Sequence, residues 1–395
     1  MHIHTTKKNE KIKDIAENYT VNESLISSIN GMSSEPTEGE EILVLIPTRS
    51  YTVQYGDSAD KIALRFGVRQ NDLTAMNPHI KVDRLREGEV IALKYAEAPL
   101  GMSSANGYCY KDCSDDAFNR AMPFLTYVTF ASAFSDRSGI HKIFDDDEKV
   151  AKAIKMKKTP LIRVHDRCEE RYKNAHDRST YADELIELAT SGGYRGIVLN
   201  GCNIECSADD YCSFLIDLRK RMIGCDLILI TEVNENSPIE YSEYADASVL
   251  YYPKYAMDNP PSFTDGEGRV LADFACRGES AKAFIDLPLL AKNDHGYSTI
   301  DEALRIARRQ GDPIRQNEST LLSHFNDKEQ GECRFMSLKG LYELFKLMHE
   351  YDYMGMCFDI MKTPISFLQM YGSLFKTSYF SYVNSRVGCN HEGEG

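Results

Sequence analysis

The chain has 395 residues, of which 42% are hydrophobic, so it is long enough for a barrel-sized domain with a smaller unit beside it. Its 46 basic and 60 acidic residues leave a formal charge of -14, which argues against a nucleic acid or an anionic membrane as partner, because both need a basic face. The first ten residues are polar and no later run approaches the roughly 18 apolar residues of a membrane span, so we expect no signal peptide, no spanning helix and synthesis in the cytoplasm.

The N-terminal region carries a repeat. Residues 15–21 (IAENYTV) align with residues 62–68 (IALRFGV) at an offset of 47 positions, and the match continues at Ile26/Leu73 and Asn30/Asn77. A repeat of this size indicates one small supersecondary unit used twice. In each copy the apolar spacing predicts a short strand, two helices and a closing strand, so we expect βααβ modules at residues 1–48 and 49–96.

The second copy resembles a LysM module over its full length, on residues 51–58 (YTVQYGDS) and on Ile62, Ala63, Phe66, Gly67, Val68, Leu73, Asn77, Pro78, Leu85, Gly88 and Glu89. The resemblance implies binding of the N-acetylglucosamine backbone of peptidoglycan or chitin, in a shallow groove between the loop after the first strand and the loop after the second helix. The glycan-binding residues that it implies are Gly56, Asp57, Ser58, Asn77, Pro78, His79 and Ile80. A purely structural role for Asn77 and Pro78, as the cap of a helix, is the alternative.

The first copy departs from this pattern. Asn9, Glu10 and Lys11 stand where the family has Gly-Asp-Thr or Gly-Asp-Ser, and the loop that matches the second half of the groove is Asn30-Gly31-Met32. Glycan binding by the first copy therefore stays an open question.

After a linker at residues 97–105, the chain alternates short apolar runs with helical spans, such as residues 181–189 and 211–219. The apolar runs lie at 107–110, 124–131, 160–164, 197–202, 227–233, 247–252, 284–289 and 354–361. Eight buried strands with helical crossovers predict an α/β fold, a (β/α)8 TIM-type barrel over residues 106–387. We expect an insertion near residues 291–353 that holds a small strand pair, an amphipathic span at 365–382 and a loose tail at 388–395.

The barrel region resembles glycoside hydrolase family 18, and within it the spore cortex-lytic N-acetylglucosaminidases that carry two N-terminal LysM modules. The matching pieces are residues 105–108 (ANGY), 123–128 (PFLTYV), 193–196 (GYRG), 214–219 (FLIDLR) and 285–289 (IDLPL). The resemblance implies substrate-assisted hydrolysis, in which a glutamic acid at the end of strand four protonates the glycosidic oxygen while the N-acetyl carbonyl of the substrate attacks C1.

The catalytic motif of that family is degenerate in this chain. Its four acidic positions, D-x-x-D-x-D-x-E, fall on Arg195, Val198, Asn200 and Cys202. None of these side chains is a carboxylate, and a thiol with a pKa of about 8.5 is a poor substitute for a tuned carboxylic acid.

Other catalytic positions of the family are also replaced. Pro253 stands where the family has the tyrosine that supports the N-acetyl group, and Asp359 stands where it has the tryptophan under the sugar. The chain contains no tryptophan. Since charge stabilisation and the stacking platform are lost together, we expect the barrel to be non-hydrolytic.

Polar residues nevertheless remain at the predicted strand ends: His165, Asp166, Asn200, Glu232, Asn234, Lys254 and Asp359. One interpretation is a satisfied polar network left where a site used to be. The alternative is an active glycosidase with relocated acids, for which Glu205, Glu232 and Asp359 are the candidates, because strand carboxyl ends are where barrel sites form.

The eleven cysteines are odd in number and scattered, which indicates mostly reduced thiols. Neither the Cys109/Cys113 pair nor the Cys202/Cys206/Cys212 group has the paired spacing of a zinc site, so we expect no metal and no cofactor. The expected partners are peptidoglycan or another GlcNAc-containing glycan, and other spore or wall proteins, with the chain deposited on the spore or cell-wall surface. A coat component cross-linked through exposed cysteines is a further alternative.

Overall fold

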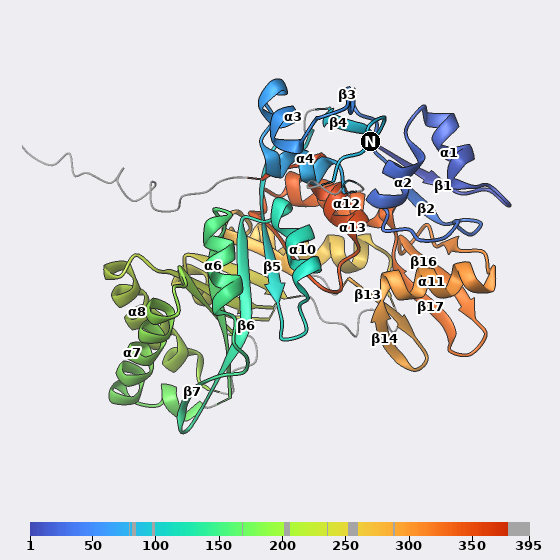
Figure 1. The fold of residues 1–395 in the computed structure, drawn as a ribbon. Helices are drawn as coiled ribbons and strands as arrows, with labels where there is room; N and C mark the ends of the chain where they lie inside the picture. Colours follow the sequence, from blue (N-terminus) through green and yellow to red (C-terminus); the bar gives the residue numbers. More distant parts are fainter. Residues whose placement is uncertain are drawn as a thin grey trace, which may run out of the picture.

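The computed structural model describes residues 1–78, 80, 84–96, 99–167, 169–200, 206–234, 236–251, 260–286 and 289–377. Two small N-terminal modules lie against a barrel, and an inserted sheet lies beside the first module (Figure 1). The predicted positions His79, Cys202, Glu205, Pro253 and Lys254 lie outside the described residues.

Each N-terminal module has the predicted βααβ order. The first, called module 1, consists of β1 (His2–Thr5), α1 (Ile12–Tyr19), α2 (Glu23–Ile29) and β2 (Glu41–Val44). The second, module 2, consists of β3 (Arg49–Thr52), α3 (Ala59–Phe66), α4 (Gln70–Met76) and β4 (Val90–Lys94). In both modules the two strands pair antiparallel, with Ile15 and Ile26 or Ile62 and Leu73 in the core beneath them.

Local sequence fixes the ends of these helices. Ser58 caps α3, since its side chain accepts a hydrogen bond from the backbone N–H of Lys61, and Gly67 ends α3 at a φ of 67°. In module 1 the equivalent left-handed position is occupied by Thr20, at a φ of 55°.

Eight parallel strands close into the predicted TIM-type barrel. In spatial order they are β5 (Met102–Cys109), β18 (Gly355–Asp359), β12 (Ala283–Asp286), β11 (Ala247–Tyr251), β10 (Ile228–Val233), β9 (Gly196–Leu199), β8 (Thr159–Asp166) and β6 (Tyr127–Asp136), and β6 pairs with β5 to complete the circle. The surrounding helices are α5 (Asp115–Ala121), α6 (Asp147–Lys155), α7 (Ala175–Ser191), α8 (Ala208–Gly224), α9 (Glu240–Glu243), α10 (Arg269–Cys276), α12 (Leu338–Glu350) and α13 (Ile365–Leu374). Each predicted apolar run contributes one of these strands.

Side chains alternate between the barrel interior and the helical layer, as the period of a strand requires. Val198 on β9 lies in the interior cluster with Leu161 and Ile230, whereas Leu199 packs with the outer core. Gly196 begins β9 where space is short, because a Cβ atom there would lie 2.5 Å from the carbonyl oxygen of Ile228 on β10. The strand at residues 196–199 is therefore a packed scaffold element between β8 and β10.

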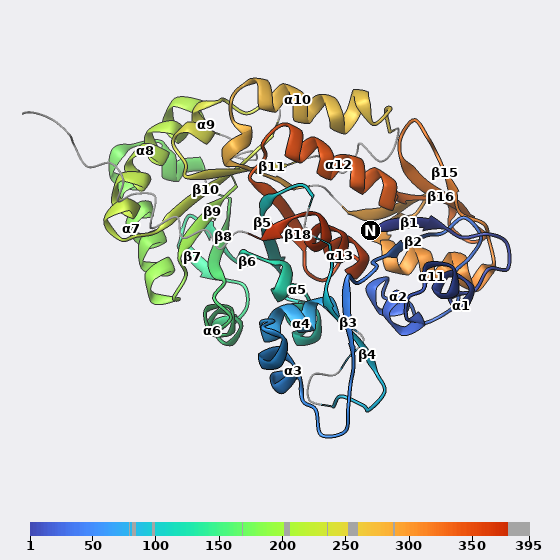
Figure 2. The ribbon, with the colours of Figure 1, turned by 90° about the horizontal axis from the view of Figure 1, so that it is seen from above.

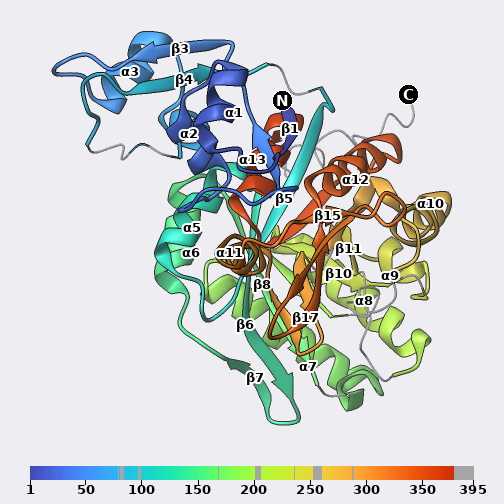
Figure 3. The same cartoon turned by 90° about the vertical axis from the view of Figure 1, so that its right-hand side faces the viewer.

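The carboxyl ends of the barrel strands face away from the two modules. Strand β6 ends in an antiparallel hairpin with β7 (Gly139–Lys142), and Figure 3 shows this hairpin on the side of the molecule opposite the modules. At its amino end, β5 pairs with the short strand β19 (Lys376–Thr377).

The inserted segment is larger than the predicted strand pair. It forms a five-stranded antiparallel sheet, in the order β14 (Gly296–Thr299), β13 (Leu290–Asn293), β17 (Gly331–Met336), β16 (Leu322–Asp327) and β15 (Arg315–Gln316), together with α11 (Ile300–Gln310). Only β16 and β17 correspond to the predicted pair. The other strands are only two to four residues long, so they carry little periodic signal.

Helix α13 is buried on most of its surface rather than on one face. Its buried residues include Phe367, Gln369 and Tyr371, since α13 lies between the barrel and the two modules (Figure 2). The Gln369 side-chain amide donates to the carbonyl oxygen of Ala75 in module 2, 2.9 Å away.

Candidate functional site

Three positions of the degenerate motif, Arg195, Val198 and Asn200, are described, and they follow β9 from its amino end to its carboxyl end; Cys202 lies outside the described residues. Arg195 is exposed at the amino end, where its backbone N–H bonds the carbonyl of Pro160. Val198 is buried in the barrel interior. Asn200 follows the strand at the carboxyl end, 2% exposed, with its Nδ2 3.2 Å from Nδ1 of His165. The structure therefore brings only Asn200 of these three described residues to the mouth of the barrel.

The strongest polar feature at the mouth is an ion pair between Arg163 on β8 and Glu232 on β10. Arg163 Nε lies 2.5 Å from Glu232 Oε1 and Nη2 lies 2.7 Å from Oε2, which is a bidentate geometry. Tyr108 on β5 donates its hydroxyl to Oε1 at 3.1 Å. The side chain of Glu232 is 5% exposed and that of Arg163 is 20% exposed. The three residues join opposite sides of the barrel.

Burial and charge set the proton equilibria around this ion pair. Burial acts to lower the pKa of Arg163, but the Glu232 carboxylate outweighs it, so the pKa is raised. Burial, with the adjacent carboxylate, raises the pKa of Tyr108 well above its usual value. The pKa of His165 is lowered by burial and by the cations of Arg163 and Arg167, which favours the neutral imidazole near pH 7.

Both oxygens of Glu232 already accept hydrogen bonds from the guanidinium, and one also accepts from Tyr108. A general acid needs a proton on a carboxyl oxygen that faces the substrate. In the observed arrangement both oxygens are instead engaged by donors of the barrel itself.

Asp359 ends β18 at the same end of the barrel and serves the turn that follows. Its Oδ1 accepts hydrogen bonds from the backbone N–H groups of Met361 and Lys362, at 3.0 and 3.2 Å. Its Oδ2 lies 2.9 Å from Nζ of Lys362, which also lies over the ring of Tyr110 at 5.3 Å. Glu232 and Asp359 are thus paired with different cations.

Sequence reasoning missed Arg163 and the two tyrosines at the mouth. Tyr108 and Tyr110 stack with ring centroids 6.2 Å apart. The available signal was the position of Arg163 inside the apolar run 160–164, on the same face as Leu161 and His165, because a cation within a buried strand requires a partner.

In module 2, two of the candidate glycan-binding residues brace the loops from within. Asp57 Oδ2 accepts hydrogen bonds from the Tyr51 hydroxyl at 2.7 Å and from the backbone N–H of Gln54 at 2.9 Å. Asn77 is fully buried; it donates to the carbonyls of Leu73 and Ala92, and accepts from the Ala92 N–H at 2.6 Å. Both side chains act as structural ties in this arrangement.

The other described candidates differ in exposure and role. Gly56 is exposed at a φ of 79°, Ser58 is the cap of α3, Pro78 is half-buried and Ile80 is buried. Beside Gly56 lies Tyr55, whose side chain is 91% exposed, the most exposed large hydrophobic residue in the described chain. An aromatic face in this loop suits packing against a sugar ring.

Module 1 keeps the same internal ties with different residues. Glu10 replaces Asp57 and accepts hydrogen bonds from the backbone N–H of Lys7 at 2.7 Å and from His4 at 2.9 Å. The Asn30 side-chain amide donates to the carbonyls of Ile26 and Leu43, and Asn77 makes the equivalent bonds in module 2. The altered sequence therefore preserves the fold of the loop.

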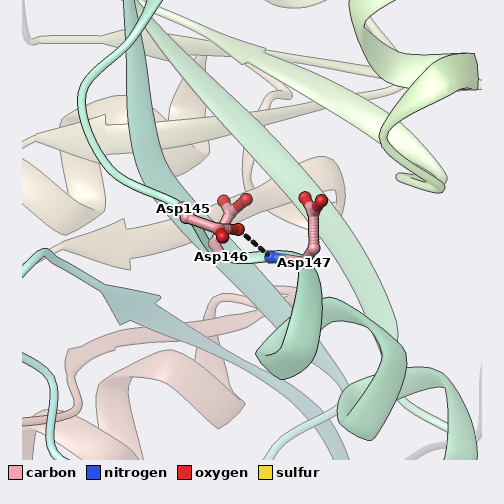
Figure 4. Close-up of side chains that lie close together, drawn as sticks. All are labelled: Asp145, Asp146 and Asp147. Carbon is pink, nitrogen blue, oxygen red and sulfur yellow. Dashed lines mark hydrogen bonds between the residues drawn. The ribbon is translucent and has the colours of Figure 1, made fainter.

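Asp145, Asp146 and Asp147 form a cluster of carboxylates at the start of α6 (Figure 4). Asp146 is buried against Lys142 and the hydroxyl of Tyr194, and the backbone N–H of Asp147 donates to Asp145 at 3.1 Å. Acidic residues at a helix N-terminus are stabilised by the helix dipole, which accounts for this cluster as a structural feature.

A search of the described residues for a helix long and apolar enough to cross a bilayer identifies none.

Comparison with known proteins identifies residues 51–94 as a LysM domain. The whole chain has the fold of the spore cortex-lytic enzyme SleL from Bacillus cereus, at a TM-score of 0.73 and 16% identity, covering 96% of this chain and 100% of that one. The SleL structure from Bacillus megaterium QM B1551 matches at the same TM-score and identity, covering 96% and 99%.

A chitinase from Chromobacterium violaceum matches with a TM-score of 0.59 and 13% identity, over 69% of this chain and 98% of its own. The comparison with curated proteins gives no match. These findings show a LysM domain at residues 51–94 and a barrel that shares its fold with the SleL and chitinase structures.

Proposed function

We propose that the chain is a spore- or wall-associated protein that binds peptidoglycan or another GlcNAc-containing glycan through module 2, and that its barrel does not hydrolyse the glycan. The LysM match at residues 51–94 supports the binding role. The SleL structures, which are spore cortex-lytic enzymes, share the fold over 96% of this chain and support the association with spores.

The observation that carries the non-hydrolytic role is the ion pair between Arg163 and Glu232 at the barrel mouth. Substrate-assisted hydrolysis needs a carboxylic acid that can donate a proton to the leaving oxygen. Among the candidates that the structure describes, Glu232 is the most deeply buried carboxylate at these strand ends, and its oxygens accept hydrogen bonds from Arg163 and Tyr108. Releasing a carboxylate from such a buried pair costs about 3–5 kcal/mol.

The test is incubation of the full chain with chitooligosaccharides and muropeptides, followed by measurement of released GlcNAc and new reducing ends. We expect no release above a blank that lacks protein. Release that scales with protein concentration would overturn the non-hydrolytic proposal.

A specific observation favours a second candidate, an active glycosidase. Glu232 and Asp359 both lie at the carboxyl ends of barrel strands, where they face the mouth. In that case the parent protein turns over substrate, and Glu232→Gln abolishes turnover while the binding of glycan by module 2 is unchanged. A parent protein without turnover removes this candidate.

The binding role is tested by Tyr55→Ala, since Tyr55 is the exposed aromatic residue of the first loop of module 2. Loss of one aromatic contact of about 1 kcal/mol weakens binding roughly fivefold. The matched control is Lys8→Ala, at the equivalent position of module 1. Titration calorimetry with chitopentaose should show weaker binding for the first variant only; equal affinity of both variants and the parent would contradict the assignment.

A further inference from the structure

We infer that module 1 is a docking module, locked onto the inserted sheet and α13, and that the chain has a single glycan site, in module 2. The number of glycan sites rests on the proposed function, whereas the docking stands on contacts within the chain. The inference concerns the face of module 1 formed by the turn at residues 37–41 and by the loop at residues 30–32.

The first observation is a buried ion pair between the module and the insertion. Arg308 on α11 binds Glu40 through Nε, at 3.0 and 3.2 Å from the two carboxylate oxygens, and through Nη2, at 2.5 Å from Oε1. The side chains are 9% and 2% exposed. Separating module 1 from α11 would leave both charges without this partner, and an uncompensated buried charge is strongly destabilising. The ion pair therefore favours the docked arrangement.

Backbone contacts surround the ion pair. The Ile314 N–H donates to the carbonyl of Glu38 at 2.8 Å, the Thr37 hydroxyl donates to the carbonyl of Asp312 at 2.9 Å, and the Gln316 amide donates to the carbonyl of Gly39 at 2.6 Å. A Cβ atom on Gly39 would lie 1.9 Å from the carbonyl oxygen of Ile314. The turn is therefore in direct backbone contact with the segment that leads into β15, an edge strand of the inserted sheet.

The equivalent turn in module 2 faces open space, so the two modules of the same chain differ at this turn. Glu89 accepts from the backbone N–H of Arg86 just as Glu40 accepts from Thr37, at 3.0 and 3.1 Å. Yet a Cβ atom on Gly88 would meet nothing within 4 Å. In Figure 2, α3, β3 and β4 of module 2 extend away from the insertion, whereas α1, α2, β1 and β2 lie against it.

The apolar contacts show the same division. Leu25, Ile29, Leu43 and Leu45 of module 1 belong to the main core cluster of the molecule. Each module also encloses a small cluster of its own, around Ile15 in module 1 and around Ile62 in module 2. The residues of module 2 that pack against the main core, Ala75 and Tyr95, are only partly buried. One face of module 1 is thus part of the barrel-and-insertion core.

The two loops that correspond to the glycan groove are tied together in module 1. Glu35, in the loop after α2, accepts a hydrogen bond from the backbone N–H of Ile12 at 2.9 Å, and Ile12 begins α1 after the first loop. On the other side, a Cβ atom on Gly31 would lie 3.0 Å from Cγ2 of Ile365 on α13. The Glu35 carboxylate thus joins the two loops on one side of the groove, and α13 packs against the other side. We infer that this groove serves the packing of module 1 and not the binding of a glycan.

The number of glycan sites is tested by titration calorimetry of the full chain with chitopentaose. We expect one oligosaccharide per chain, with hydrogen-exchange protection confined to module 2. Two equivalents per chain, or protection of the loops at residues 7–11 and 30–36, would overturn the single-site inference.

The docking is tested without any glycan, so its failure is distinguishable from failure of the proposed function. In Arg308→Ala we expect amide hydrogen exchange across residues 37–44 and 312–316 to rise at least tenfold. The matched control is Arg309→Ala, the exposed neighbour on α11, which should leave both segments unchanged. Gln316→Ala removes the side-chain bond to Gly39 and keeps the ion pair, so we expect a smaller rise in amide hydrogen exchange over the same two segments. Unchanged exchange in both Arg308→Ala and Gln316→Ala would overturn the docking.

Discussion

At the scale of single residues, the buried ion pair of Arg163 and Glu232 is where we expect a substitution at the barrel mouth to cost most stability. Arg163→Met removes the bidentate donor and leaves the Glu232 carboxylate buried with Tyr108 as its remaining partner in this network. We expect a loss of about 3 kcal/mol in the free energy of unfolding of the barrel, measured by urea denaturation.

The double variant Arg163→Met/Glu232→Leu separates charge from packing. Replacing both partners of a buried pair by apolar residues of similar size is often neutral, so the double variant should recover most of the lost stability. If it is as unstable as Arg163→Met alone, the loss comes from packing and the ion pair is not its cause.

Glu41 provides a pH dependence at the contact between module 1 and α12. Burial raises the pKa of this carboxyl group above 4.5, and hydrogen bonds and charge from Lys339 only partly oppose the shift. Glu40 and Arg308, already paired with each other, line the same small cavity as Glu41.

Because the folded chain holds the Glu41 proton more tightly than the unfolded chain, this contribution to stability is fully present below pH 4.5 and is lost as the pH rises through the folded pKa. We expect Glu41→Gln to reduce the fall in stability between pH 4.5 and pH 7, measured by the urea midpoint at each pH. The same slope in the parent and in Glu41→Gln would rule out Glu41 as its source.

Sequence reasoning at this scale located residues without showing where their side chains point. Asp57 and Asn77 lie in the two loops of module 2 and their side chains bond within the module, so their contact with a glycan stays a prediction. The roles depend on whether a side chain points inward, and a loop without regular periodicity does not reveal that.

At the scale of elements, the eight barrel strands were predictable because each is a short apolar run between helical spans. Strand β9 is the clearest case, since the glycine-rich turn and the run Ile197-Val198-Leu199 specify a buried parallel strand. The five-stranded insertion was not predictable in full, because β13, β14 and β15 are only two to four residues long, and β13 joins the rest of the sheet through β17 at the far end of the insertion.

Helix α13 shows how tertiary contacts alter the meaning of a pattern. Its apolar residues predict an amphipathic helix with one solvated face, yet Gln369 on the polar side is buried and bonded to module 2. The partner of that face lies almost 300 positions earlier in the chain, so no local pattern could reveal it.

At the scale of the whole molecule, the two modules should differ in how they unfold. Module 1 has a small core of its own, but it also places Leu25, Ile29, Leu43 and Leu45 in the main core, and Arg308 and Ile314 tie it to the insertion. The residues of module 2 that pack against the main core, Ala75 and Tyr95, are only partly buried. Cooperative units in a protein follow such contiguous packing.

We therefore expect native-state hydrogen exchange in rising urea to give two groups of amides. Those of β1 and β2 should lose protection together with the barrel strands, and those of β3 and β4 should lose protection at lower urea as a separate unit. Chitopentaose should raise the urea concentration at which β3 and β4 open and leave the first group unchanged, because a ligand stabilises only the unit that binds it. Opening of module 1 before module 2 would mean that the buried contacts at residues 37–41 contribute less than the module's own small core.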